Sequence, residues 1–203
     1  MPSRRRRLRL STSERRALLL AAAARVFRRR GYAAATVTAV VKEAKVSRGT
    51  FYAHFDSKRR LLAAVAGELL DRILPRFPAP PALSTRADLE RVFAEMNRLA
   101  FEGVAREPAV ARLVLGGGVG SEAAAVRLLA AHDAGWKRLT TSILQRARGA
   151  KLLRDGLDLG LASDLVVAST QRLVRAIAAG TATGAVAPLA ARLAELQAAS
   201  VSR

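Results

Sequence analysis

Apolar residues recur every three or four positions along most of the chain, which is the spacing of amphipathic α-helices. The first such stripe runs from Leu18 to Phe27. Ser11 and Glu14 precede it with the spacing of a capping box, and Gly31 follows it as a helix C-cap. The pattern therefore predicts that the chain begins with one long helix, whose other face is rich in arginine.

Two short helices around a tight turn are predicted between Thr36 and Lys58. Thr36 and Ser47 are suitable N-caps for the two helices. The second helix, residues 48–55, buries Phe51 and Phe55, which are four positions apart. The residues on its other faces are Arg48, Thr50, Tyr52, Ala53 and His54. Several of these side chains are donors suited to phosphates and base edges, so the segment predicts a helix-turn-helix whose second helix enters the DNA major groove.

The remaining stripes predict about six further helices, which brings the total to about nine. They lie near residues 58–74, 85–100, 108–115, 121–143, 161–179 and 188–199. Asp56 or Ser57 caps the first of these helices, and the prolines of residues 75–81 separate it from the next. The segment GGGVG at 116–120 predicts a loop and a hinge. It is not a phosphate cradle, because no Gly-Lys-Ser/Thr follows it.

This pattern predicts an all-α protein with two domains. Residues 1–60 would form an N-terminal arm and a three-helix helix-turn-helix domain. Residues 61–203 would form a helical domain for effector binding and dimerisation, and the helix that begins near Lys58 would link the two. The length of 203 residues is sufficient for such cores, and the low aromatic content of 4% fits a helical protein.

Charge changes the picture because it is distributed unevenly. Of a net charge of +19, residues 1–60 carry 17 Lys and Arg against 3 Asp and Glu, a net of +14. The other 143 residues carry 18 against 13, a net of +5. A GC-rich coding sequence inflates arginine and accounts for part of the excess, but it does not explain the asymmetry. The positive charge lies where a phosphate-binding surface requires it.

The phrase VSRGTFYAHFDSK, preceded by TVTAVVKEA and by RRRGY, resembles the DNA-binding region of TetR-type transcriptional regulators. The resemblance is residue-specific over about Ser11 to Leu62 and architectural afterwards. The sequence departs from the family twice: Lys45 stands in the turn where the family usually has Gly, and Val41 stands where it usually has Ala. Lys45 costs about 1 kcal/mol if its φ is positive and little otherwise.

The resemblance also implies roles for individual residues. It implies that Arg48, Gly49, Thr50 and Ala53 face base edges and that Thr38, Tyr52, His54 and Lys58 mostly bind phosphates. Thr36 and Ser47, the predicted caps, belong to the same DNA-binding set. The arginine arm, Arg4, Arg5, Arg6 and Arg7, either contacts phosphates and the minor groove or is a disordered tail.

Helix positions between residues 93 and 140 suggest an effector cavity. His132 and Trp136 fall on one apolar face, where a polar tip in an apolar pocket would orient a small molecule. The full candidate set is Phe93, Met96, Phe101, His132, Trp136 and Thr140. The alternative is that His132 is a hydrogen-bonded core histidine beside a core tryptophan.

The last two helices are candidates for a dimer interface. Their candidate positions are Leu165, Ser169, Leu173, Ile177, Leu189, Leu193 and Leu196. The pair either closes the core of a monomer or, as the resemblance to TetR-like proteins implies, builds a four-helix interface between two copies.

The leading hypothesis is a dimeric transcriptional repressor, released from a palindromic operator by a small-molecule effector. The second is a basic, nucleoid-type DNA-binding protein without an effector, although such a protein has little use for the helices after residue 83. An enzyme is not expected, because the chain has no cysteine, only His54 and His132, and no catalytic motif. No cofactor, metal site, membrane span or targeting peptide is expected, which favours the cytoplasm.

Overall fold

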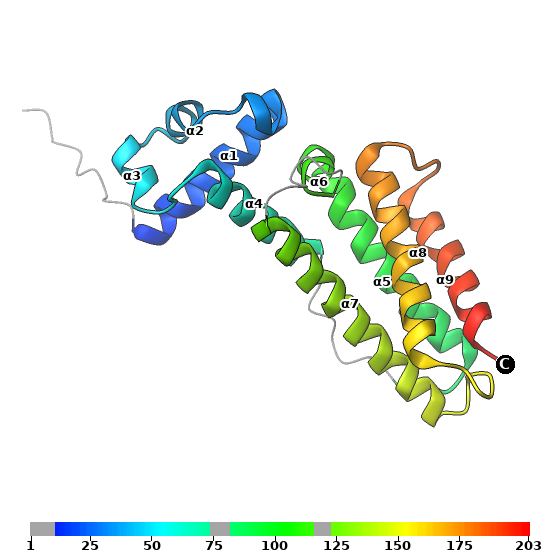
Figure 1. Cartoon of the computed structure of the whole chain (residues 1–203). Coiled ribbons are helices and arrows are strands. Elements are labelled where there is room, and N and C mark those ends of the chain that lie inside the picture. Colours follow the sequence, from blue (N-terminus) through cyan, green and yellow to red (C-terminus); the bar gives the residue numbers. More distant parts are fainter. Residues whose placement is uncertain (1–10, 74–81, 116–122) are drawn as a thin grey trace, which may run out of the picture. The chain divides into compact units, whose positions relative to one another are not determined.

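The computed structural model of the protein describes residues 11–73, 82–115 and 123–203, and every regular element of these residues is a helix (Figure 1). This confirms the all-α prediction. The helices are α1 (Thr12–Ala34), α2 (Val37–Ala44), α3 (Arg48–Tyr52), α4 (Lys58–Ile73), α5 (Arg86–Arg106), α6 (Pro108–Leu115), α7 (Ala123–Gly149), α8 (Leu159–Ala179) and α9 (Val186–Val201). The chain divides into two compact units at Val65 and Ala66, within α4.

Local capping chemistry explains where the helices of the first unit begin. The Ser11 hydroxyl accepts from the Glu14 amide, and the Glu14 carboxylate accepts from the Ser11 amide, as predicted for a capping box. The Thr36 hydroxyl caps α2 and the Ser47 hydroxyl caps α3. Ser57 rather than Asp56 caps α4, because its hydroxyl accepts from the amide of Arg60.

Two helix ends of the first unit differ from the prediction, and in the second unit α5 and α7 each extend six residues beyond their predicted ends. Gly31 does break the helical geometry, with φ of +72°, but a further helical turn continues to Ala34. The helix α3 ends at Tyr52, three residues before the predicted end. The amides of His54 and Phe55 both bond to the carbonyl of Phe51, which tightens the chain into a turn. Ala53 and His54 therefore follow α3 instead of lying inside it.

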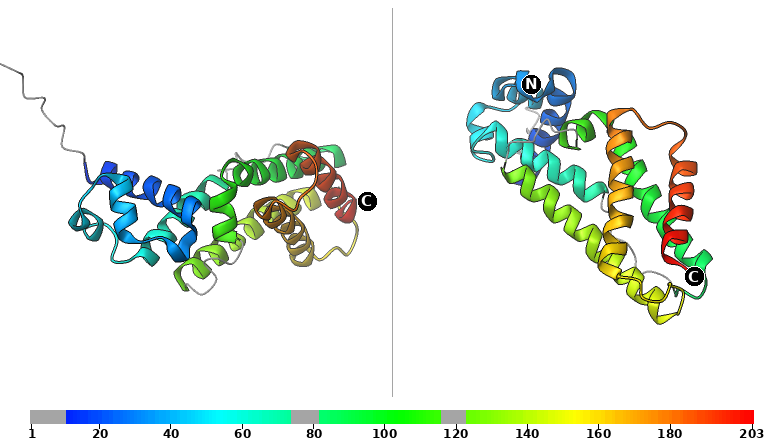
Figure 2. Two further views of the ribbon diagram at one scale, coloured as in Figure 1. Left: turned by 90° about the horizontal axis from the view of Figure 1, so that it is seen from above. Right: turned by 45° about the vertical axis from the view of Figure 1, so that its right-hand side comes forward.

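The second unit is built around three neighbouring helices. Figure 2 shows α5, α8 and α9 side by side, with α7 along α8. The α5 helix starts with a capping box formed by Thr85 and Asp88, and α8 ends at Gly180 in the left-handed conformation. Pro188 lies at the third position of α9 rather than the first, which a proline tolerates because the first-turn amides have no helical partner.

Some sequence expectations fall outside the described residues. These are the arginine arm Arg4–Arg7, the prolines of 75–81, the glycine segment 116–120 and the start of a helix at Ser121. Within the part that the structure describes, no helix combines the length and the apolar character of a membrane span.

Candidate nucleic-acid interface

The recognition helix α3 is anchored by two phenylalanines. Phe51 is fully buried and Phe55 is nearly so, with ring centroids 6.0 Å apart. The guanidinium of Arg16 on α1 lies 5.6 Å from the centre of the Phe55 ring. These contacts fix one face of α3 and leave the opposite face open to a partner.

The predicted DNA-binding residues of this segment are largely accessible. Those classed as exposed are Thr36, Thr38, Ser47, Arg48, Gly49, Tyr52 and Ala53, and those half-buried are Thr50, His54 and Lys58. Tyr52 is the clearest case of an accessible side chain, because this large aromatic residue is 51% exposed although its neighbour Phe51 is buried. Aromatic hydroxyls held at a surface in this way suit phosphate contact.

The hydroxyls at the helix starts already have partners. Ser47 Oγ accepts from the Thr50 amide at 3.0 Å and lies 2.9 Å from Thr50 Oγ1. Thr36 Oγ1 accepts from the Ala39 amide at 3.1 Å. Thr36 and Ser47 thus position the first turns of α2 and α3, and their DNA contact stays a prediction.

Gly49 has no structural need to be glycine. A Cβ at this position would meet only Ser47 Oγ, at an ordinary 3.6 Å. Glycine inside a helix costs roughly 0.5–1 kcal/mol relative to alanine. The fold therefore does not explain Gly49, and its contact with base edges stays a prediction.

Lys58 has a structural task that its sequence position does not reveal. Its ammonium donates to the carbonyls of Tyr32, Ala33 and Ala35 at 2.9, 3.3 and 2.9 Å, and it lies 4.4 Å from the centre of the Tyr32 ring. Lys58 therefore ties the start of α4 to the end of α1. Phosphate binding by Lys58 stays a prediction, and it would require the exchange of one of these bonds.

Glu43 on α2 forms ion pairs that connect this helix to α1. Its carboxylate accepts from Arg25 at 2.7 Å and from Arg29 at 2.5 Å. These two hydrogen bonds, with Arg25 the stronger influence, lower the pKa of Glu43 to about 2. The carboxylate is consequently ionised at neutral pH and neutralises part of the arginine surface of α1.

The turn between α2 and α3 adopts the conformation that glycine favours. Lys45 has φ of 56° and ψ of 40°, and its amide bonds back to the carbonyl of Lys42. This is the costlier of the two outcomes expected for Lys45, because a β-carbon in the left-handed region crowds the backbone.

Lys45→Gly should accordingly raise the free energy of unfolding by about 1 kcal/mol. Urea denaturation followed by far-UV circular dichroism would measure it. Lys45→Ala is the matched control, because it removes the same charge but keeps the β-carbon. Equal stabilisation by glycine and alanine would attribute the gain to charge and contradict the conformational explanation.

The six effector candidates all lie in the interior of the second unit. Phe93, Met96 and Phe101 are buried on α5, and His132, Trp136 and Thr140 are buried on α7. The structure brings two of them together, since Trp136 Nε1 donates to His132 Nε2 at 3.3 Å. Thr140 Oγ1 is buried and has no hydrogen-bond partner among the described residues.

The dimer candidates divide into two groups. Leu165 on α8 and Leu196 on α9 are 55% and 68% exposed. The others, Ser169, Leu173, Ile177, Leu189 and Leu193, are half-buried. Leu161, which the sequence did not single out for this role, is 71% exposed on the same α8 face as Leu165. The sequence could have indicated Leu161 for this role, because it lies four positions before Leu165 and the two leucines therefore share one face of a helix.

Comparison with known proteins agrees with this geometry. Residues 19–65 match the model of the bacterial regulatory proteins of the tetR family. No relative was found among the curated proteins.

Solved structures resemble almost the whole chain. The fatty acid degradation regulator FadR of Bacillus halodurans is 17% identical, with a TM-score of 0.70 over 90% of this chain and 94% of its own. FadR of Bacillus subtilis, solved in complex with stearoyl-CoA, is 18% identical, with a TM-score of 0.69 over 90% and 97%. SmeT, the repressor of the Stenotrophomonas maltophilia multidrug efflux pump SmeDEF, is 20% identical, with a TM-score of 0.71 over 95% and 92%. At these identities the likeness establishes a shared fold.

Proposed function

The chain is a DNA-binding transcriptional regulator of the tetR family, and from this premise we propose that it is a dimeric repressor released from a palindromic operator by a small molecule. Members of this family are transcriptional regulators and not enzymes. The observation that carries the proposal is the anchored helix α3, whose buried Phe51 and Phe55 present Arg48, Gly49 and Tyr52 to a partner. Action on chromosomal DNA implies a cytoplasmic location.

The exposed residues of α3 divide by the chemistry they offer. Arg48 at the helix start can donate two bonds to a guanine edge, which reads sequence. Tyr52 donates one bond and fits a phosphate, which fixes register without reading sequence. The concentration of positive charge in residues 1–60 supplies the salt-dependent part of the affinity.

Two alanine variants should separate these roles. Arg48→Ala should relax preference at one or two base positions, and Tyr52→Ala should weaken binding to all duplexes, each by about 1–3 kcal/mol. Selection from random duplex DNA at several salt concentrations would identify the preferred site, and titrations would then compare the variants. Uniform, steeply salt-dependent binding by the parent would support the nucleoid-type alternative, and unchanged binding by both variants would show that α3 is not the recognition helix.

The outward faces of α8 and α9 support a two-fold dimer. Of the large apolar side chains exposed in the described residues, the three most exposed are Leu161, Leu165 and Leu196. The small residues Ala168, Ala191 and Ala199 are also exposed on these two helices, which would permit close packing of helices from a second copy. A two-fold axis would in turn give two recognition helices for two half-sites.

The double variant Leu165→Glu/Leu196→Glu should separate the dimer into monomers of 21.6 kDa. Each copy would bring two carboxylates into an isologous interface, four in all, and their burial should weaken association by at least about a hundredfold. Light scattering at micromolar concentration would measure the mass. Val126→Glu, at a 50% exposed position on α7, is the matched control and should leave the mass unchanged. A parent mass of 21.6 kDa would refute the dimer.

Effector binding is proposed for the interior of the second unit. Phe93, Met96 and Trp136 supply apolar surface there, and Thr140 Oγ1 offers a buried hydrogen-bonding group that no described residue satisfies. Of the proteins with the same fold, FadR of Bacillus subtilis was solved in complex with stearoyl-CoA and SmeT is a repressor, which supports a ligand-responsive repressor here. Any such ligand can shift the equilibrium only by its preference for the non-binding conformation.

A further inference from the structure

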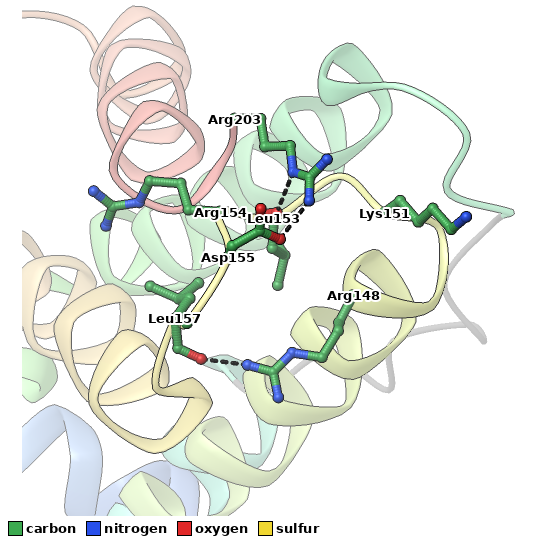
Figure 3. Close-up of a pocket in the computed structure, with 8 residues that line it drawn as sticks. Arg148, Lys151, Leu153, Arg154, Asp155, Leu157 and Arg203 are labelled. Carbon is green, nitrogen blue, oxygen red and sulfur yellow. Dashed lines mark hydrogen bonds and ion pairs between the residues drawn. The ribbon is translucent and has the colours of Figure 1, made fainter.

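A pocket of about 480 Å³ lies at the turn between α7 and α8, in the unit that does not contain the helix-turn-helix (Figure 3). Four of its lining residues are cationic: Arg148, Lys151, Arg154 and Arg203. Asp155 is the one carboxylate that lines it. The side chains of the lining therefore carry a net charge of about +3 at neutral pH.

The loop that carries these residues is held in place by the end of the chain. Leu153 forms an isolated antiparallel bridge with Ser202, and its side chain is buried. The Arg154 amide donates to the Val201 carbonyl at 3.0 Å, and the Arg203 amide donates to the Leu152 carbonyl at 3.2 Å. An anion would therefore meet a loop whose backbone is already ordered, which lowers the entropic cost of binding.

Two of the arginines use only part of their donor capacity in holding the loop. Arg148 donates to the Leu157 carbonyl, while Arg203 donates to the Leu153 carbonyl and to the Asp155 carboxylate. Figure 3 shows their guanidinium groups reaching the loop from two different sides. A guanidinium has five N–H donors, so each of the two retains donors for a ligand.

Lys151 and Arg154 complete the pocket at its rim. Their side chains extend to opposite sides of the loop (Figure 3), and neither forms an ion pair or side-chain hydrogen bond with any described residue. Both residues are exposed, so their long side chains can turn toward a ligand at little cost. The charge that they add is not needed to hold the loop.

We propose that this pocket binds a small multivalent phosphate, such as the diphosphate group of a phosphorylated metabolite. Planar guanidinium groups match the spacing of phosphate oxygens in two parallel hydrogen bonds, and several cations around one pocket favour a multiply charged anion over chloride. The proposal is independent of the DNA-binding role, because every residue involved belongs to the second unit.

Titration calorimetry with inorganic pyrophosphate at constant ionic strength, on the full chain, would test the proposal. Lys151→Gln/Arg154→Gln should weaken the binding by about tenfold, because each exposed cation contributes a modest charge-assisted contact to the anion. Arg127→Gln/Arg138→Gln removes the same charge from exposed positions on α7 and should bind as the parent does. An equal loss in both double variants would overturn the site and indicate general attraction to a basic protein.

Hydrogen exchange of the parent supplies a measurement that needs no variant. Pyrophosphate should slow amide exchange in residues 148–158, and unchanged exchange there would overturn the proposal even if the helix-turn-helix unit binds pyrophosphate. Citrate, which has similar charge but carboxylate oxygens, tests the ligand class. Equal affinity for citrate would show that the pocket does not select phosphate.

Discussion

Phe51→Ala should remove about 3–5 kcal/mol from the free energy of unfolding of the helix-turn-helix unit. Phe51 is 0% exposed, and it is the one fully buried side chain of the five-residue helix α3. A helix of this length has no stability of its own and depends on its tertiary anchor. Folded domains retain roughly 0.05–0.15 kcal/mol per residue, so a unit of 65 residues loses most of its stability, and DNA binding should be lost with it.

The adjacent residue provides the control for Phe51. Tyr52→Ala removes a ring of similar size from a position that is 51% exposed, so it should change stability by no more than about 0.5 kcal/mol while it weakens DNA binding. Trp136 is the single tryptophan of the chain and belongs to the second unit, so its fluorescence reports on that unit alone. Phe51→Ala should lower helical circular dichroism at temperatures at which Trp136 fluorescence stays native. If the two alanine variants have equal stability, Phe51 is not the anchor of α3.

Features that depend on a few neighbouring residues were predictable from the sequence. The caps at Ser11, Thr36 and Ser47 were found because each side chain bonds to an amide two or three residues further on. The anchors Phe51 and Phe55 were found from their i, i+4 spacing. The family resemblance then led to the prediction that residues on and beside this helix face DNA.

Features that depend on tertiary contacts were not predictable in the same way. The ammonium of Lys58 reaches the carbonyl of Tyr32, which is 26 residues away in the chain, so the sequence suggested only a phosphate partner. The sequence left the conformation of Lys45 open, because a single residue in a turn adopts a positive φ only where the crossing of two helices demands it. The pocket near Arg154 was missed because its residues come from the last turn of α7, from the loop that follows it and from Arg203, which follows α9.

The proposed dimer surface illustrates why apolar periodicity alone is insufficient. It identified α8 and α9 as amphipathic but did not distinguish a stripe that faces the monomer core from one that faces outward. In the structure Val166 and Val174 face the core of the unit, whereas Leu161 and Leu165 are exposed. The predicted row through Ser169 and Leu173 lies at the boundary between these faces, where the residues are half-buried. The exposed fraction of each side chain distinguishes the core-facing side of a helix from its outward-facing side, and that fraction is known only from the fold.

A buried polar cluster in the second unit was also missed, and it leads to the second large prediction. Asn97 on α5 donates to Gln197 Oε1 on α9 at 2.9 Å and accepts from Thr170 Oγ1 on α8 at 2.8 Å. Gln197 Nε2 in turn donates to Ser169 Oγ at 2.9 Å and to the Val166 carbonyl at 3.1 Å. Asn97, Thr170 and Gln197 are each less than 8% exposed. The cluster therefore joins three helices through hydrogen bonds that water cannot replace.

Asn97→Ala should lower the free energy of unfolding of this unit by about 2–5 kcal/mol. The substitution leaves the buried Gln197 Oε1 without its donor, at about 1–3 kcal/mol, and opens a small cavity. Thr170 Oγ1 loses the Asn97 acceptor but keeps its bonds to the Val166 carbonyl and to Gln197 Nε2. Urea denaturation followed by Trp136 fluorescence would measure the loss, because that signal belongs to the same unit.

The triple variant Asn97→Leu/Thr170→Val/Gln197→Leu shows whether the stability lost in Asn97→Ala comes from polar atoms without hydrogen bonds or from lost packing. It removes every side-chain member of the hydrogen-bonded triangle and keeps apolar volume, so it should recover most of the stability lost in Asn97→Ala. If it recovers none, packing rather than polar satisfaction explains the loss. If it recovers stability but the protein no longer forms a single dimer, the cluster serves to fix how α8 and α9 lie against α5. The exposed leucines of the proposed interface depend on that arrangement, since Leu165 and Leu196 belong to the same two helices as Thr170 and Gln197.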